Sequence, residues 1–185
     1  MPTPERTSLD EIITAAREIL EADGLDRLTM QAVAERVGVR APSLYKRVRN
    51  REALISLVAK ATVEDLGAQL HAVPRTADPR ADLAELARAF RSFAHARPAG
   101  YRLILGWTPE AVPTDTDMLT EASAPVLEVT AELAGPDQAL NAARLFTAWG
   151  NGFISMELAG AFNLGGDVEA AFEYGITRLA EAIRQ

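Results

Sequence analysis

Apolar residues recur every three or four positions along most of the chain, which is the spacing of one face of an α-helix. No segment alternates polar and apolar residues for long enough to indicate a β-strand. Helix boundaries are also marked: Ser8 and Glu11 form a capping box, and Gly24 ends the apolar stripe that follows. The pattern therefore predicts an all-α fold.

Capping residues, glycines and prolines divide the rest of the chain into further helices. Pro125 lies inside one of them and should kink or split it, because proline lacks the N–H that a helix interior needs. The helices expected from these signals cover about residues 8–24, 29–38, 41–48, 50–71, 78–98, 99–106, 115–133, 136–162 and 167–183.

The composition excludes several kinds of site. The chain of 185 residues has no cysteine, so disulfides, thiolate zinc sites and cysteine nucleophiles are absent. His71 and His95 do not lie in the HExxH spacing of helical metal sites, and we expect no metal or other cofactor. No apolar run is long enough to span a bilayer, and the first residues lack a signal-peptide pattern. We therefore expect a cytoplasmic protein without a membrane partner.

Charge is distributed unevenly along the chain, whose net charge is -7. Residues 1–51 carry nine basic and eight acidic side chains, whereas the remainder carries 10 and 18. A basic patch on an acidic protein is typical of a chain that places one face on DNA, although a solvated charged surface is an equally good explanation of charge alone. The patch lies in a stretch without acids and consists of Arg36, Arg40, Lys46, Arg47, Arg49 and Arg51.

The segment from Leu28 to Leu54 has the pattern of a helix-turn-helix. Gly38 can adopt the left-handed backbone conformation of a tight turn, and Ala34 is small enough for two crossing helices. Three apolar residues would anchor the second helix to the core: Val39, Leu44 and Val48. The alternative is a generic helical hairpin in which Gly38 merely ends a helix.

These residues resemble the DNA-binding head of the tetracycline-repressor family: a capping Thr29, the alanine, the glycine turn, Leu44-Tyr45 and a closing Asn50-Arg51-Glu52. Val48 stands where many members have phenylalanine, and Arg51 where many have lysine. The resemblance implies a three-helix DNA-binding head over residues 1–54 and a helical body over 55–185 that senses a ligand and forms a dimer.

Roles for individual residues follow from the way such a motif enters the major groove with the start of its second helix. Arg40 is the first candidate to read a base, because arginine pairs with guanine through two hydrogen bonds, and Ser43 and Lys46 come next. Ala41 and Pro42 would touch thymine methyl groups. The other expected DNA contacts are to phosphates, from Thr29, Tyr45, Arg47 and Arg51, with Tyr45 also packing partly on the core.

The end of the chain carries a second resemblance. The stretch FTAWGNGFISMELAGAF, followed by DVEAAFEYGITRL, resembles a C-terminal body of this family with a Trp-His-Gly pattern. Asn151 replaces the histidine, so no role of that histidine is carried over. Glu157 is an acid on a helix that should be buried; it could pair across a dimer, contact a polar ligand or simply be exposed.

The body's apolar residues could serve either of two functions, lining a ligand cavity or forming a dimer interface. Large side chains could line a ligand cavity between helices, although each is as easily explained by core packing. The expected cavity residues are Phe93, Trp107, Met118, Phe146, Trp149 and Phe153. Small residues and the last apolar stripe suit a four-helix dimer interface. The expected interface residues are Gly152, Ala159, Phe172, Ile176 and Leu179.

The function predicted from these features is a transcriptional repressor, not an enzyme. As a homodimer it would bind a pseudo-palindromic double-stranded operator, and a small apolar or amphipathic effector would release it. An enzyme on a helical bundle is the first rival, but the sequence has no metal-ligand spacing, nucleophile motif or phosphate loop. The second rival is a sensor that has lost its DNA target, or an activator that depends on a cofactor.

Overall fold

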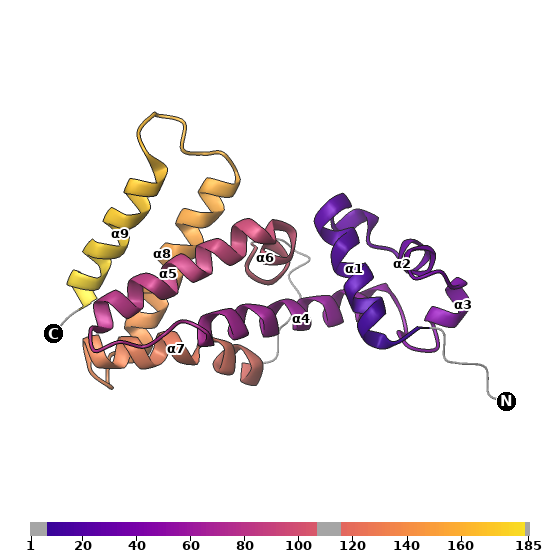
Figure 1. Ribbon diagram of the computed structural model, residues 1–185, viewed down its shortest axis with the longest axis horizontal. Helices are drawn as coiled ribbons and strands as arrows, with labels where there is room; N and C mark the ends of the chain where they lie inside the picture. The colour runs from indigo at the N-terminus through magenta and orange to yellow at the C-terminus, as the bar shows by residue number, and fades with distance from the viewer. Residues whose placement is uncertain (1–6, 107–115, 184–185) are drawn as a thin grey trace. The chain divides into compact units, whose positions relative to one another are not determined.

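A computed structural model describes residues 7–106 and 116–183, and every regular element in these two ranges is a helix (Figure 1). The all-α fold predicted from the sequence is confirmed. The helices are α1 Leu9–Asp23, α2 Met30–Arg36, α3 Ala41–Leu44, α4 Arg51–His71, α5 Pro79–Ala96, α6 Pro98–Leu105, α7 Thr116–Ala134, α8 Ala139–Leu158 and α9 Val168–Ile183, with a 3-10 turn at Leu25–Arg27.

The capping residues lie where the sequence predicted them. Ser8 Oγ accepts a hydrogen bond from the Glu11 N–H at 3.1 Å, while the Glu11 carboxylate accepts one from the Ser8 N–H at 2.7 Å. Asn50 caps α4 through the N–H of Ala53, and Asp167 caps α9. These side chains satisfy N–H groups that have no partner within the helix, which is why the helices begin at these residues.

Three helices differ from the prediction. α3 ends at Leu44, and the chain continues to Val48 in turns. α8 is shorter at both ends than residues 136–162. α7 runs through Pro125 without a break, so the split that was one of two expectations for it is absent. Pro125 is buried within the helix, although its nitrogen cannot donate the hydrogen bond of a helix interior.

The chain forms two compact units. Unit 1 comprises residues 1–63 and 97–114, and unit 2 comprises residues 64–96 and 115–185. α6 belongs to unit 1, although α5 and α7 belong to unit 2. The boundary between a DNA-binding head and a body after residue 54 stays a prediction. Its Leu103 is 5% exposed and lies in one apolar core with residues of α1, α2 and α4.

Unit 2 is a bundle of α5, α7, α8, α9 and the last turns of α4. α5 packs against α7, α8 and α9, and α8 and α9 form an antiparallel pair (Figure 1). Gly67 allows α4 to approach α7, since a Cβ there would lie 3.0 Å from the Cβ of Ala122. The buried carboxylate of Asp82 accepts hydrogen bonds from the N–H and hydroxyl of Thr76, which closes the α4–α5 connection. None of the helices in the described ranges has the length and apolar character to cross a bilayer.

Candidate nucleic-acid interface and helical body

The helix-turn-helix is formed by α2 and α3 around Gly38. Thr29 caps α2, its Oγ1 accepting from the Ala32 N–H at 3.1 Å. Gly38 has a φ of 72°, which is unfavourable for residues with a side chain. The Val39 N–H then donates to the Ala34 carbonyl at 2.9 Å and closes the turn before α3 begins. The motif predicted from the sequence is confirmed.

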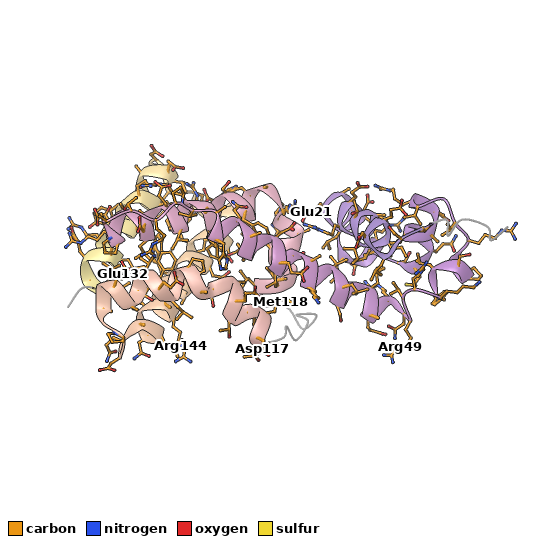
Figure 2. The ribbon with its side chains drawn as sticks, turned by 60° about the horizontal axis from the view of Figure 1, so that its bottom comes forward. Glu21, Arg49, Asp117, Met118, Glu132 and Arg144 are labelled. Carbon is orange, nitrogen blue, oxygen red and sulfur yellow. The ribbon has the colours of Figure 1, made fainter. Side chains whose placement is uncertain are left out.

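α3 and the turns after it have one buried and one exposed side. Leu44 and Val48 are 1% and 2% exposed and belong to the core of unit 1. Arg49 points outward at this end of the unit (Figure 2). Ala41 is half-buried. The other residues expected at DNA on this segment are all exposed: Arg40, Pro42, Ser43, Tyr45, Lys46 and Arg47. Their DNA contacts themselves stay predictions.

An open groove of about 910 Å³ runs along this surface. One wall comes from the turn and α3, including Arg40, Ser43 and Lys46, and the other from the start of α1. Thr7 lies in that second wall, and its hydroxyl has no hydrogen-bond partner among the described residues. The sequence analysis missed Thr7, because only the fold brings the start of α1 beside α3.

Two arginines of the basic stretch have partners within unit 1. The Arg36 guanidinium lies 3.0 Å from the Glu18 carboxylate, so its charge is paired. Arg51 donates from Nε to the Leu28 carbonyl and from Nη2 to the Leu25 carbonyl, both at 2.7 Å. Arg51 thus fastens the start of α4 to the segment before α2, a structural role that the sequence did not indicate. The phosphate contact predicted for Arg51 would have to use the guanidinium N–H groups that do not take part in these two hydrogen bonds.

In the body, Trp149 belongs to an aromatic cluster between α8 and α9. Its ring is stacked 5.3 Å from Phe172 and lies 5.8 Å from Phe153, and Phe153 in turn lies 4.7 Å from Phe162. Gly175 makes this packing fit, since a Cβ there would lie 2.3 Å from the Trp149 ring. Side chains from two helices therefore interlock around Trp149.

The other residues expected to line a cavity lie on several helices. Phe93 on α5 and Phe146 on α8 are buried. Met118 is half-buried in the first turn of α7, next to Asp117 (Figure 2). Trp107 lies outside the described residues. The ring contacts bring Trp149 and Phe153 together, but the lining of a ligand cavity stays a prediction.

The residues expected at a dimer interface separate into two groups. Phe172 and Ile176 are 0% and 2% exposed within the single chain and belong to its core, so they have little surface left for a partner to cover. Gly152 on α8 and Ala159 directly after that helix are exposed, and Leu179 is half-buried on α9. For all five residues the interface role stays a prediction.

Glu157 has a role different from each of the three considered for it. Its carboxylate accepts two hydrogen bonds from Arg91 on α5, at 2.6 and 2.9 Å, and lies 3.0 Å from Nε2 of His95. Arg91 also donates to Glu169, and its guanidinium lies 4.7 Å from the centre of the Phe172 ring. Arg91 thus links α5 to both α8 and α9 within one chain. The side chains of Arg91 and Glu157 are only about 15% exposed, whereas Glu169 is exposed.

The electrostatics of unit 2 reflect this pairing. The pKa of Glu157 is lowered, mainly by the hydrogen bonds from Arg91, with a smaller effect of His95, while burial opposes the shift. The pKa of Glu173 is lowered in the same way by Arg88, which donates to it from Nε and Nη2. Both carboxylates are therefore held in the charged form.

Two family models match the chain. The one described as "Tetracyclin repressor-like, C-terminal domain" matches residues 83–179, and the one described as "Bacterial regulatory proteins, tetR family" matches residues 12–58. Together they cover the two segments in which the sequence resembles the family, the helix-turn-helix and the C-terminal stretch. Neither description names a Trp-His-Gly body type, which stays a prediction.

Individual proteins agree with these models. An uncharacterized HTH-type transcriptional regulator from Mycobacterium tuberculosis is 30% identical over 98% of this chain and 84% of its own length. The class A tetracycline repressor of Escherichia coli is 38% identical over 57% of this chain, a stretch that spans about half of that repressor (48%).

Solved structures share the fold. A protein from Rhodococcus sp. RHA1 has a TM-score of 0.83 and 24% identity, with both chains fully covered. A TetR variant from Acinetobacter baumannii AYE, solved with minocycline, has a TM-score of 0.71 and 26% identity over 97% of this chain and 99% of that one. With its helix-turn-helix, its helical body and these relatives, the chain belongs to the tetracycline-repressor family of DNA-binding transcriptional regulators.

Proposed function

We propose that the chain is a repressor that binds a pseudo-palindromic operator as a homodimer and leaves it when a small apolar or amphipathic effector binds the body. The observation that carries this proposal is the surface of α3 and of the turns after it: Arg40, Ser43 and Lys46 are exposed, while Leu44 and Val48 anchor the segment in the core. An anchored helix with exposed donors at its start can offer fixed hydrogen bonds to base edges in the major groove.

The test of the DNA surface is Arg40→Ala. We expect it to cost roughly 1–3 kcal/mol of operator binding and to relax specificity at one base position, because a bidentate contact to guanine is lost. The measurement is the affinity of the variant for duplex DNA from the region upstream of its own gene, with each base pair substituted in turn.

The matched control for Arg40→Ala is Arg36→Ala. Arg36 is an exposed arginine of the same motif, but its guanidinium is paired with Glu18. We expect this variant to keep its sequence preference, since an exposed ion pair contributes little. Equal affinity and specificity of Arg40→Ala and the wild type would show that α3 does not read the DNA.

The proposed homodimer is supported by the exposed face of α8. Leu145 and Met156 are 50% and 48% exposed, and Ala148 and Gly152 lie between them at helical spacing. A Cβ at Gly152 would meet nothing within 4 Å. An apolar stripe with a glycine at its centre allows two helices to approach closely, and two copies of this stripe would form an isologous interface.

The proposed effector is an apolar or aromatic molecule that enters the body. Support comes from the aromatic side chains of unit 2 and from the TetR variant of A. baumannii, whose structure was solved with minocycline. Glu157 contributes little to the recognition of such a molecule, because Arg91 and His95 engage its carboxylate. An effector with few hydrogen-bonding groups is therefore favoured.

A panel of apolar aromatic molecules is the first probe for this site, and minocycline, which carries many hydrogen-bonding groups, is the polar comparison. A bound effector should raise the melting temperature through mass action, because a free ligand at 100 times its Kd adds about 2.7 kcal/mol to the free energy of unfolding. It should also quench tryptophan fluorescence. It should release DNA only if it binds the DNA-free arrangement better than the DNA-bound one. Ligands that raise the melting temperature without lowering DNA affinity would contradict the proposed release.

A further inference from the structure

One hydroxyl of unit 1 lacks the hydrogen bond that its burial requires. The Oγ1 atom of Thr7 is shielded from solvent, yet no donor or acceptor of the described ranges meets it. It is the only side-chain nitrogen or oxygen atom in this situation among the residues that the structure describes. Buried polar atoms are nearly always paired, since burial without a partner costs free energy. The folded chain by itself therefore does not account for this hydroxyl.

The start of α1 does not use the Thr7 hydroxyl. Ser8, the next residue, caps the helix by accepting a hydrogen bond from the Glu11 N–H, and the Glu11 carboxylate accepts one from the Ser8 N–H. This capping box is complete without Thr7. The Thr7 hydroxyl therefore keeps its ability to donate one hydrogen bond and to accept others.

Thr7 lines the open groove between the start of α1 and α3. The opposite wall of this groove carries one hydroxyl and three basic side chains, those of Ser43, Arg40, Lys46 and Arg47. None of the described residues that line the groove is acidic. Cations along one wall and an unused hydroxyl in the other suit an anion, and an open groove can admit a stretch of an extended polymer.

A second groove of unit 1, between α1 and α2, has a different charge. Its volume is about 570 Å³, and it is lined by Thr29, for which the sequence also predicts a phosphate contact. Three acidic and two basic side chains share this lining: Asp23, Asp26, Glu35, Arg27 and Arg36. Because carboxylates repel a phosphate, the groove at Thr7 is the more favourable of the two for the DNA backbone.

We propose that Thr7 is a positioning residue that donates a hydrogen bond to a phosphate of the DNA backbone, in the groove that it shares with Lys46. This rests on the proposed function, because the ligand is the operator. Rotation about the Cα–Cβ bond of Thr7 moves the hydroxyl to another staggered position, in which it faces the groove and gains the acceptor that the DNA-free chain lacks. Phosphate contacts fix the register of a protein on DNA without reading bases. Thr7 thus holds α1 against the backbone while α3 occupies the major groove.

The test compares Thr7→Val, which keeps the shape of threonine without its hydroxyl, with Thr7→Ser, which keeps the hydroxyl. The affinity of Thr7→Val for duplex DNA from the region upstream of its own gene should fall by about tenfold per bound chain, as for one lost hydrogen bond to a charged group. The same factor should apply to a duplex of unrelated sequence. The melting temperature of Thr7→Val should stay equal or rise, because an unpaired buried hydroxyl is removed. Thr7→Ser should bind DNA like the wild type.

Neutral backbone linkages identify the group that Thr7 contacts. Methylphosphonates, placed one at a time along the duplex, each remove the charge of one phosphate. At the contacted position the wild type should lose affinity and Thr7→Val should lose clearly less, because its half of the interaction is already absent. Thr14→Val is the matched control, since Thr14 is exposed on the same helix but does not line the groove. This variant should match the wild type at every linkage.

The outcomes separate the role of Thr7 from the function on which it rests. Equal DNA affinity of Thr7→Val and the wild type would overturn the role. A loss of affinity shared by Thr7→Val and Thr7→Ser, with a lower melting temperature, would overturn it too, because Thr7 would then serve only the fold. A loss that no single methylphosphonate diminishes would exclude a backbone contact. If the wild type bound neither duplex, the proposed DNA-binding function itself would fail.

Discussion

Replacing Arg91 by methionine should lower the free energy of unfolding by about 2–4 kcal/mol, because it leaves a poorly exposed carboxylate without its main partner. Glu157 accepts two hydrogen bonds from Arg91, and both side chains are only about 15% exposed. The change also removes the guanidinium above the Phe172 ring. Urea unfolding at pH 7 measures the loss.

The dependence of the unfolding free energy on pH, measured at acidic pH, tests whether the charge of Glu157 causes this loss of stability. Because the folded-state pKa of Glu157 is lowered, its contribution to stability is present above the ordinary value of 4.5 and is lost as the pH falls below it. The Arg91→Met variant should therefore lose less stability than the wild type over that acid range. Arg178→Met is the matched control, since Arg178 also pairs with an acid and lies over a ring but is exposed, and it should change little.

A double variant separates the ion pair from simple packing. Adding Glu157→Leu to Arg91→Met removes the unpaired charge, and it should recover part of the lost stability because a buried pair can often be replaced by apolar side chains. If the double variant is as unstable as Arg91→Met, the loss comes from packing of Arg91 on Phe172 and not from the Glu157 charge.

Replacing Gly152 by leucine should convert the proposed dimer into a folded monomer. A Cβ at position 152 meets nothing within 4 Å of the same chain, and Gly152 is exposed, so we expect the new side chain to be tolerated within the protomer. Leucine also favours the helix over glycine by about 1 kcal/mol. Between two copies of the α8 stripe, however, it would hold the helices apart. Light scattering reports the oligomeric state, and thermal unfolding reports the fold.

The affinity for the operator should fall when Gly152→Leu abolishes the dimer. Two linked heads gain about 100-fold or more over one head, so a monomer should lose affinity by that factor. Gly152→Ala is the matched control, since one methyl group fits a close helix crossing more easily and should leave the dimer largely intact. A Gly152→Leu protein that remained dimeric would place the interface elsewhere than on the exposed face of α8.

The helix-turn-helix could be predicted from the sequence because its interactions are local. Thr29 caps α2 three residues away, Gly38 supplies the positive φ of the turn, and Asn50 caps α4 through Ala53. Each contact joins residues within a few positions of each other, so the residue types and their spacing identify it. The exposed and buried sides of α3 follow from helical periodicity in the same way.

Side chains of the body were harder to assign, because periodicity tells which face of a helix is apolar but not what covers it. Phe172 and Ile176 form such a stripe, and only the packed bundle shows that the chain's own helices bury them. Leu145 and Gly152 have the same character in the sequence, yet they are exposed in the single chain. The difference depends on which helices pack together.

The sequence by itself determined the helix-rich fold, the capped boundaries and the DNA-reading motif, since these depend on neighbours along the chain. Tertiary structure alone decided the contacts between distant residues. Arg91 meets Glu157 across 66 positions, and Glu21 meets Gly100 across 79. It also placed α6 in the DNA-binding unit instead of the body around it. Such pairs leave no periodic signal in the sequence, because any charged residue has many candidate partners and only the packing of the helices selects one.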